Sequence, residues 1–320
     1  MRCMRAAFAS TVDADDPLAA LRVGELPEPD PPAPDWTVVE VRASSLNHHD
    51  LWSLRGVGLP ADRLPMILGC DAAGVDDAGN EVVVHSVVPD PADPRGMSIL
   101  SERYPGTFAD RVTVPRSNLI PKPAGLTFTE AACLPTAWLT AYRMLTTRGR
   151  VDQAESVLVQ GAGGGVATAA VVLAVALGKR VYATSRDAEK QERVAALGAT
   201  ALASGSRLPE RVDVVIETVG AATFDHSMKS AAPGARIVVS GATSGHLPAV
   251  DLRRVFAMQL EILGTSMGTP DELRDLLALC AQRGIRPVVD TEYGFSEVRD
   301  AFTRLHAGST FGKLVLDHRR

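Results

Sequence analysis

The stretch VLVQGAGGGVATAAVVLAVALG, residues 157–178, limits the possible folds of this 320-residue chain more than any other. No charged residue occurs from Ser156 to Gly178, and an apolar segment of that length can cross a bilayer. Four of the five residues at 161–165 are glycine, however, and glycine in the interior of a helix is strongly destabilising. The stretch therefore predicts a buried strand, a tight turn and a buried helix rather than a membrane span.

Strands and helices continue to alternate after this stretch. RVYATS (180–185), DAEKQERVAALGA (187–199) and VDVVIETVG (212–220) predict a strand, a helix and a strand. Elements of these lengths in this order are typical of βαβ units in a parallel sheet. Just before them, residues 129–148 have helical spacing, and Pro135 predicts a kink within that helix.

The N-terminal third has a different character. WTVVEVRAS (36–44), GNEVVVHSVV (79–88) and GTFADRVTVP (106–115) have the alternating or β-branched composition of strands. LPEPDPPAPD (26–35) is too rich in proline for the inside of a sheet and predicts a surface connection. The fold class is therefore α/β, with a β-rich unit followed by a doubly wound parallel sheet.

Charge and cysteine content narrow the class of protein. Lys and Arg number 33 against 38 Asp and Glu, and no basic block occurs, which argues against nucleic acid or an anionic membrane as the main partner. The four cysteines are far apart and form no CxxC pair, and the N-terminus has no signal-peptide pattern. We expect a cytoplasmic protein that acts on a small molecule.

The glycine turn predicts a dinucleotide site. Its glycines allow a sharp turn and let a pyrophosphate approach the N–H groups at the start of the following helix. The spacing is GxGxxx, with Ala167 in place of the third glycine, where only close helix–strand packing is required. A glycine-rich turn without a ligand is the alternative. The residues assigned to the cofactor here are Gly161, Gly163, Gly164, Gly165 and Val166.

The end of the second strand favours NADP over NAD. NAD sites usually carry an acidic residue there for the ribose 2′-hydroxyl, whereas this strand ends at Ser185 with Arg186 and Lys190 close behind. A hydroxyl and two cations suit a 2′-phosphate, which a carboxylate would repel. Asp187 could take the NAD role if the register shifts, and the two cations could also be ordinary surface residues.

Seven motifs follow one another along the chain: VEVRASSLNHHDLWSLRG, PMILGCDAAGV, GTFADRVTVP, AACLPTAWLTAYRML, VLVQGAGGGVA, DVVIETVG and FGKLVL. In their order and spacing the chain resembles the medium-chain dehydrogenase/reductase superfamily, in particular its zinc-free quinone oxidoreductase branch. The resemblance implies a GroES-like β-rich catalytic domain (1–122 and 266–320), a Rossmann domain (123–265) and an active site between the two.

The same resemblance argues against a metal. Zinc-dependent alcohol dehydrogenases of this superfamily take their catalytic ligands from positions that correspond here to Asn47, Cys70 and Thr136, of which only Cys70 is a good zinc ligand. The structural zinc lobe with its four cysteines is also missing. His48 and His49, if they lie on an extended segment, point to opposite sides and do not share an ion. We therefore expect no metal.

Several residues receive roles by resemblance. His48 and His49 are candidate proton donors, since an imidazole titrates near neutral pH, and each can instead simply hydrogen-bond within its turn. Asp50 is a third candidate catalytic residue, although a structural role as a hydrogen-bond acceptor fits it better. The resemblance also assigns residues to the cofactor, and for each of them an ordinary structural role is the alternative. The further residues that the resemblance assigns to the cofactor are Asn47, Thr140, Val219, Gly241, Ala242 and Lys313, the last of these at the phosphates.

The expected activity is hydride transfer from NADPH to a quinone or to the activated C=C bond of an α,β-unsaturated carbonyl. Such acceptors are already polarised and do not require a Lewis acid. The alternatives are an enoyl-thioester reductase, an alcohol dehydrogenase of the same superfamily and a non-catalytic NADPH-binding protein. The resemblance also implies a homodimer that pairs edge strands, for which LEILGTSMG (260–268) is the candidate.

Overall fold

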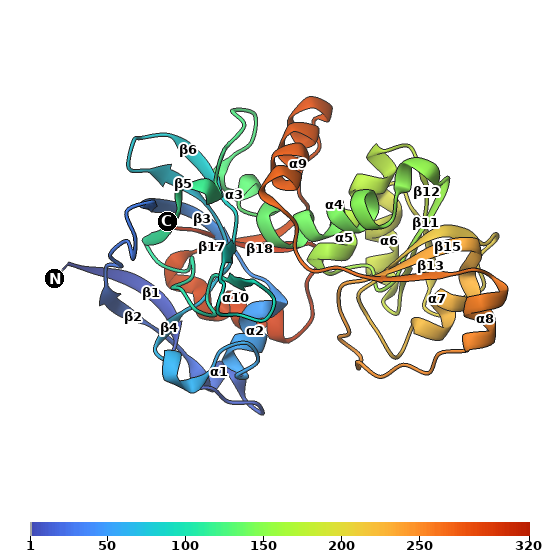
Figure 1. Ribbon diagram of the computed structural model, residues 1–320, viewed down its shortest axis with the longest axis horizontal. Coiled ribbons are helices and arrows are strands. Elements are labelled where there is room, and N and C mark those ends of the chain that lie inside the picture. The colour runs from blue at the N-terminus through green and yellow to red at the C-terminus, as the bar shows by residue number, and fades with distance from the viewer. Residues whose placement is uncertain (1) are drawn as a thin grey trace. The chain divides into compact units, whose positions relative to one another are not determined.

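The computed structural model describes residues 2–320, which divide into two compact units (Figure 1). Unit 1 contains residues 1–136, 269–281 and 289–320, and unit 2 contains residues 137–268 and 282–288. Unit 1 is thus made from both ends of the chain, with unit 2 inserted. The first division follows Thr136 rather than residue 122, and residues 282–288 belong to unit 2.

Unit 2 is built on a six-stranded sheet in which all neighbouring strands are parallel. Its order is β13-β12-β11-β14-β15-β16, the doubly wound order that the alternation of strands and helices predicted. The strands are β11 (Ser156–Val159), β12 (Arg180–Ser185), β13 (Thr200–Ala203), β14 (Val212–Glu217), β15 (Ala231–Val239) and β16 (Glu261–Gly264).

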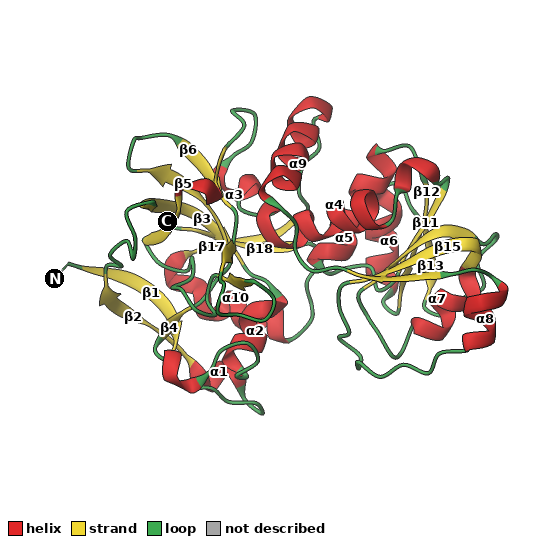
Figure 2. Cartoon of the chain, in the orientation of Figure 1, coloured by secondary structure: helices red, strands yellow, loops and turns green. Residues whose placement is uncertain are grey.

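Helices cover both faces of this sheet (Figure 2). One set packs on β11, β12 and β13 and the other on β14 and β15, as right-handed crossovers require. Because both faces are covered, the central strands are mostly apolar, and β11 is buried at every residue. The helices of unit 2 are α4 (Leu139–Arg143), α5 (Gly165–Ala176), α6 (Ala188–Ala196), α7 (Phe224–Ser230) and α8 (Leu252–Ala257).

The uncharged stretch from Ser156 to Gly178 forms β11, the glycine turn and α5, as predicted. No helix among residues 2–320 is long and apolar enough to span a bilayer. The predicted kink at Pro135 takes the form of π-helical turns, at Leu134–Trp138 and again at Met144–Arg148, on either side of α4. A π turn accommodates the hydrogen bond that proline cannot donate.

Unit 1 is β-rich and joins the two ends of the chain in one sheet. That sheet has the order β10-β6-β5-β3-β18-β17, with β9 also paired to β3, and a smaller sheet has the order β2-β1-β4. The strands are β1 (Cys3–Ala9), β2 (Leu21–Pro27), β3 (Trp36–Ser45), β4 (Met66–Ile67), β5 (Asp71–Asp76), β6 (Glu81–Val84), β7 (Val87–Pro89), β8 (Met97–Ile99), β9 (Arg111–Pro115), β10 (Leu119–Pro121), β17 (Val289–Gly294) and β18 (Lys313–Asp317).

The helices of unit 1 are α1 (Pro17–Ala20), α2 (His48–Leu54), α3 (Phe128–Ala131), α9 (Pro270–Arg283, whose last residues lie in unit 2) and α10 (Val298–His306). Two of these helices pack on the sheets of unit 1, α3 on β3, β5 and β18 and α10 on β2, β17 and β18. The proline-rich segment 26–35 differs from the prediction at its start, because Leu26 and Pro27 end β2. Proline is tolerated there since β2 is an edge strand.

His318, next to the end of β18, makes the stability of unit 1 sensitive to acid. Its Nε2 pairs with the Ser44 hydroxyl at 2.8 Å, and burial lowers its pKa to about 3. The unfolded chain binds this proton near pH 6.5 and the folded chain does not, so the free energy of unfolding falls as the pH drops below 6.5. Between pH 7.5 and 5, we expect His318 to account for a loss of about 2 kcal/mol.

Urea unfolding of His318→Asn at these two pH values tests this expectation. The variant should lose about 2 kcal/mol less than the wild type on acidification, whereas His306→Gln, at an exposed histidine, should behave as the wild type does. An equal loss in His318→Asn and wild type would contradict it.

Candidate functional site

The glycine turn of unit 2 has no room for side chains at two positions. Gly161 has φ +68° and Gly163 has φ +134°, both in the region that favours glycine. A Cβ at Gly161 would lie 2.4 Å from Cγ2 of Val219, and a Cβ at Gly163 would lie 2.9 Å from Cδ of Lys190. The predicted cofactor residues at 161, 163, 190 and 219 therefore lie together around one turn.

The turn leads into a helix whose first N–H groups have no side-chain cap. Gly164 is the N-cap of α5, and the helix begins with Gly165 and Val166. The unpaired N–H groups and the helix dipole at such an end attract an anion. This end of α5 is therefore able to bind a pyrophosphate, which is the role predicted for Gly164, Gly165 and Val166.

The end of β12 lies beside this turn. The Ala162 N–H donates to the carbonyl of Thr184 at 2.7 Å, which joins the turn to β12 just before Ser185. Arg186 is exposed, and the Lys190 side chain lies over Gly163. The Asp187 carboxylate caps α6 by accepting the Lys190 N–H at 3.2 Å. The Asp187 carboxylate thus accepts a backbone hydrogen bond, while Lys190 lies next to the turn and Arg186 directly follows β12.

A buried carboxylate fixes the loop that carries Val219. Glu217, at the end of β14, accepts the N–H groups of Val219 (2.8 Å) and Gly220 (3.0 Å). Its other donors are the hydroxyls of Thr223 and Ser227, at 2.9 and 2.6 Å. This holds Val219 against Gly161.

The remaining predicted cofactor residues of unit 2 lie on α4 and after β15. A Cβ at Gly241 would lie 2.9 Å from the carbonyl of Thr218, and one at Gly220 would lie 3.1 Å from Cβ of Ala242. Gly241 and Ala242 therefore pack on the loop that Glu217 fixes. Thr140 is buried on α4.

In unit 1, Lys313 lies in a buried network with Asn47 and Asp71. Its ammonium donates to the carbonyl of Leu46 (2.7 Å), to Oδ1 of Asn47 (2.6 Å) and to Oδ2 of Asp71 (3.1 Å). All three N–H groups are engaged, and the side chain is 2% exposed. The ammonium has no donor left for the cofactor phosphates in this arrangement, which differs from the predicted role of Lys313.

Asn47 and Thr136, two of the three positions that correspond to zinc ligands, contact other protein groups in this structure. Oδ1 of Asn47 faces the Lys313 ammonium, and its Nδ2 donates to Asp71 at 2.8 Å. The Thr136 hydroxyl lies 3.4 Å from that of Ser86. An amide and an alcohol are poor zinc ligands.

His48 and His49 begin helix α2, which corrects the expectation of an extended segment. Asn47 is the N-cap, and Asp50 completes a capping box by accepting the Asn47 N–H at 2.7 Å. The other carboxylate oxygen of Asp50 accepts the Gly69 N–H at 3.1 Å. Burial raises the pKa of Asp50 to about 6, while His49 and the Asn47 N–H oppose the shift. Both of its oxygens therefore accept hydrogen bonds from backbone N–H groups.

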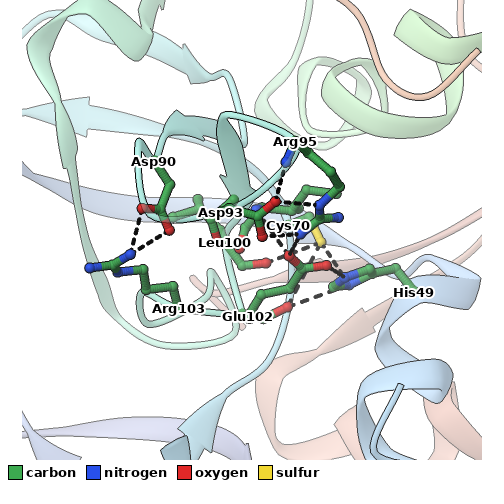
Figure 3. Close-up of polar contacts among 11 residues, drawn as sticks. His49, Cys70, Asp90, Asp93, Arg95, Leu100, Glu102 and Arg103 are labelled. Carbon is green, nitrogen blue, oxygen red and sulfur yellow. Dashed lines mark hydrogen bonds and ion pairs between the residues drawn. The ribbon is translucent and has the colours of Figure 1, made fainter. Parts of the chain in front are cut away.

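His49 lies between a thiol and a carboxylate (Figure 3). Its Nδ1 is 3.2 Å from Sγ of Cys70, and its Nε2–H donates to Oε1 of Glu102 at 3.3 Å. Arg95 pairs with the other oxygen of Glu102 at 3.0 Å. Burial opposes the charged imidazole, but Cys70 and Glu102 outweigh it and raise the pKa of His49 well above its usual value. Burial also raises the pKa of the Cys70 thiol.

His48 has different surroundings. Its side chain is exposed. The protein around the imidazole and the positive charges of Lys313 and Arg55 lower its pKa, so it is neutral near pH 7. The two neighbouring histidines thus differ in both exposure and charge.

His49, Asp50 and Cys70 each offer one ligand atom, and these atoms lie within 4.8 Å of one another. A thiol and an imidazole suit zinc by type. In this structure they face each other at hydrogen-bond distance, and both oxygens of Asp50 accept backbone N–H groups. The group does not present three uncommitted donors to a metal ion.

Three polar residues of these networks are absent from the predicted site. Glu102 comes from the irregular loop after β8, Asp71 begins β5, and Glu217 ends β14. Glu217 and Asp71 are fully buried, which is unusual for carboxylates, but burial is visible only in the structure. For Glu217, its place at the carboxyl end of a predicted parallel strand was the one available hint.

Comparison with known families matches both parts of the chain. Residues 33–124 match the alcohol dehydrogenase GroES-like domain, and residues 183–316 match the zinc-binding dehydrogenase domain. An acryloyl-coenzyme A reductase of Sulfurisphaera tokodaii is 26% identical over 327 residues, which cover 94% of this chain and 97% of that protein. A zinc-type alcohol dehydrogenase-like protein of Schizosaccharomyces pombe is 29% identical over 316 residues, which cover 88% of this chain and 91% of that protein.

Solved structures match over the full length. An NAD-dependent alcohol dehydrogenase superposes with a TM-score of 0.88 at 32% identity, covering 98% of this chain and 99% of that one. A 2-octenoyl-CoA carboxylase reductase, in complex with NADP and 2-octenoyl-CoA, superposes with a TM-score of 0.88 at 25% identity. The match covers 98% of this chain and 87% of that one.

Proposed function

Because the chain belongs to the medium-chain dehydrogenase/reductase superfamily, we propose that it is an NADPH-dependent oxidoreductase that reduces the activated C=C bond of α,β-unsaturated carbonyls, or quinones, without zinc. The observation that carries the proposal is the Asn47 amide, whose oxygen accepts from the Lys313 ammonium where a zinc ligand would be required. Alcohol oxidation in this superfamily relies on a Lewis acid, and a conjugated acceptor does not.

The proposed chemistry assigns different tasks to the two units. When bound, the nicotinamide cofactor supplies the hydride. In unit 2, the start of α5 holds the pyrophosphate, and Val219, Thr140 and Gly241 are the candidate neighbours of the nicotinamide. In unit 1, His48 is the exposed imidazole. It exchanges a proton with solvent readily and can pass one to the carbon or oxygen that becomes negative after hydride transfer.

Within this reaction class, an enoyl thioester is a substrate candidate beside enones and quinones. The likeness to two acryloyl-coenzyme A reductases, at 26% and 29% identity, supports it, as does that to the 2-octenoyl-CoA carboxylase reductase. The likeness to alcohol dehydrogenases supports the second candidate function, alcohol oxidation, which the metal content of the protein tests.

The test is NADPH oxidation against a panel of quinones, enones, enoyl thioesters and alcohols. We expect turnover with one of the first three classes by protein that holds far less than one zinc per chain. His48→Gln is the variant that should slow turnover without weakening NADPH binding. Stoichiometric zinc together with alcohol oxidation would contradict the proposal, and tight NADPH binding without any turnover would favour a non-catalytic role.

Cofactor preference gives a separate prediction. Lys190 lies against Gly163 of the turn and Arg186 directly follows β12, so replacing both by alanine should remove most of the preference for NADPH over NADH. We expect at least a 10-fold fall in the ratio of kcat/KM for the two cofactors, since each cation contributes a charge-assisted hydrogen bond to the 2′-phosphate. Arg207→Ala, at an exposed arginine elsewhere in unit 2, is the control. A ratio unchanged in the double variant would contradict the assignment.

The proposal includes a cytoplasmic homodimer. Four free cysteines, three of them buried, fit a reducing compartment. Strand β16 is an edge of the six-stranded sheet, and Ile262 on it is 41% exposed; Leu252 and Phe256 of α8 are also exposed. An uncovered edge with apolar neighbours is a site for pairing with a second copy. A monomeric mass by light scattering would contradict this part.

A further inference from the structure

A chain of buried polar side chains crosses the carboxyl ends of three neighbouring strands in unit 2. Thr184 lies near the end of β12, Gln160 directly follows β11, and Glu217 ends β14. These strands are neighbours in the order β12-β11-β14, and all three side chains are 0% exposed. In doubly wound sheets, ligands bind outside the carboxyl ends of the strands where the strand order reverses, which here is between β11 and β14. The chain of side chains therefore lies at the expected cofactor end of the sheet.

Main-chain N–H groups stand at both ends of this chain. At one end, the Gly161 N–H donates to the hydroxyl oxygen of Thr184 at 3.3 Å. At the other end, the Val219 N–H donates to Oε1 of Glu217 at 2.8 Å. Gly161 and Val219 also face each other, because a Cβ at Gly161 would lie 2.4 Å from Cγ2 of Val219. The glycine turn and the loop against it are thus joined by a second route inside the protein.

Gln160 and Ser227 connect the two ends. Oε1 of Gln160 accepts from the Thr184 hydroxyl at 2.6 Å, and its Nε2 donates to the Ser227 hydroxyl oxygen at 3.0 Å. Ser227, on α7, donates its own proton to Oε2 of Glu217 at 2.6 Å. Each hydroxyl accepts one of these hydrogen bonds and donates another. The hydrogen bonds therefore run without a gap from Gly161 to Glu217.

Glu217 sets the direction of these hydrogen bonds. Four donors surround its oxygens, two of them main-chain N–H groups, and an ionised carboxylate only accepts. Ser227 must therefore donate to Glu217, which leaves the Ser227 oxygen to accept from Gln160. The amide oxygen of Gln160 consequently faces Thr184, and the Thr184 oxygen is left for the Gly161 N–H. One donor direction satisfies every group in the chain.

A second contact fixes the Gln160 amide independently. The carbonyl of Ser206 can only accept, so Nε2 of His226, 2.8 Å from it, carries a proton. In the neutral imidazole, Nδ1 then accepts from Nε2 of Gln160 at 2.8 Å. A flipped amide would bring its oxygen against Nδ1, which is also an acceptor. The orientation of the Gln160 side chain is therefore set from two sides.

These contacts order the turn before any ligand binds. The N–H groups of Gly161 and Ala162 both end on Thr184, the first on its hydroxyl and the second on its carbonyl at 2.7 Å. Hydrogen bonds in a buried chain polarise one another, so the loss of one link weakens the others. When the chain is broken, the ligand has to order the turn itself, and that cost raises its dissociation constant.

We propose that Gln160, Thr184 and Ser227 are positioning residues for the nicotinamide dinucleotide. They anchor the glycine turn to Glu217, and the N–H groups for the pyrophosphate and the side chain of Val219 are thereby held in one arrangement. They act through the turn and the loop rather than by contact with the cofactor. The positioning role rests on the proposed cofactor, whereas the hydrogen-bond chain does not.

The test is a double-variant cycle in the full-length protein, with the Kd for NADPH measured by fluorescence titration. Thr184→Val keeps the side-chain shape but removes both hydrogen bonds of the hydroxyl, and we expect an about 10-fold weaker Kd. Ser227→Ala removes a link on α7 and should weaken Kd about 5-fold. The double variant should lose little more than Thr184→Val alone, because both changes break one chain. Thr184→Ser keeps the hydroxyl and should recover most of the affinity lost in Thr184→Val.

Ser156→Ala is the matched control, since Ser156 is a buried hydroxyl at the opposite end of β11 and donates to Asp213 at 2.9 Å. It should lower the free energy of unfolding without changing Kd. Hydrogen–deuterium exchange without NADPH gives a second readout. The peptide that contains Gly161 should exchange faster in Thr184→Val and Ser227→Ala than in the wild type, and at the wild-type rate in Ser156→Ala.

The outcomes separate this role from an ordinary structural one. Fold-losses that multiply in the double variant, or an unchanged Kd in Ser227→Ala, would overturn the proposal while the wild type still binds NADPH. A wild type that binds neither NADPH nor NADH would overturn it together with the proposed cofactor. Binding with the expected cycle but without turnover of any substrate would support the positioning role and reject only the proposed reaction.

Discussion

Replacing Lys313 by methionine is expected to lower the free energy of unfolding by about 3–5 kcal/mol, the range for breaking a buried ion pair. Lys313 is the cation beside Asp71, which is 0% exposed. Oδ1 of Asp71 has no hydrogen-bond partner among the described residues, so the carboxylate already depends on the donors to Oδ2. Without the ammonium, a charge would remain buried with only Asn47 and Ser45 as donors.

Urea unfolding measures this loss, with Lys229→Met as its control. Lys229 pairs with Asp225 at 2.6 Å, but the two side chains are 65% and 73% exposed, so that variant should lose less than about 1 kcal/mol. The double variant Lys313→Met, Asp71→Asn should recover part of the stability, because it removes the unpaired charge. A loss below about 1 kcal/mol in Lys313→Met would show that Asp71 is not held as a buried anion.

The second large effect is expected at Gly161. Alanine at this position would place Cβ 2.4 Å from Val219 while the backbone keeps φ +68°. The turn would have to move away from the loop that Glu217 fixes, and the N–H groups at the start of α5 would move with it. A rearrangement that costs about 3 kcal/mol corresponds to roughly a 100-fold weaker Kd for NADPH, measured by fluorescence titration.

Gly178→Ala separates the clash from backbone strain. Gly178 also has a positive φ, +75°, but nothing lies within 4 Å of its added Cβ. This control should lose stability without losing affinity for NADPH. The double variant Gly161→Ala, Val219→Ala should regain part of the affinity, since only Cβ of Val219 would then remain, at 3.9 Å. Unchanged binding in Gly161→Ala would mean that the cofactor does not use this turn.

Local sequence patterns predicted unit 2 well. The strand, glycine turn and helix of residues 157–178 are contiguous, and the parallel order of the sheet follows from the alternation of strands and helices. The expectation that both ends of the chain share one unit came from the family resemblance, and the pairing of β18 with β3 agrees with it. Such pairing over long sequence separation has no local signal.

The polar networks of unit 1 were much less predictable. Lys313 reads as a surface cation in FGKLVL, and only the fold shows that its ammonium ends at Asp71 and Asn47. His48 and His49 begin a helix and do not lie on an extended segment, and the spacing Asn-x-x-Asp of the capping box formed by Asn47 and Asp50 is the local signal for that helix. Glu102 lies in an irregular loop, where neither periodicity nor a motif specifies a partner.

The central claim is hydride transfer to a conjugated acceptor without a metal, and deuterium transfer tests it most directly. Protein freed of metal by a chelator would be mixed with NADPH carrying deuterium at the transferred C4 position and with an enone or enoyl thioester, and the product would be examined by mass spectrometry and NMR. We expect one deuterium at the β-carbon of the saturated product for each NADP formed. Transfer that begins only after zinc is restored, or a saturated product without deuterium, would contradict it.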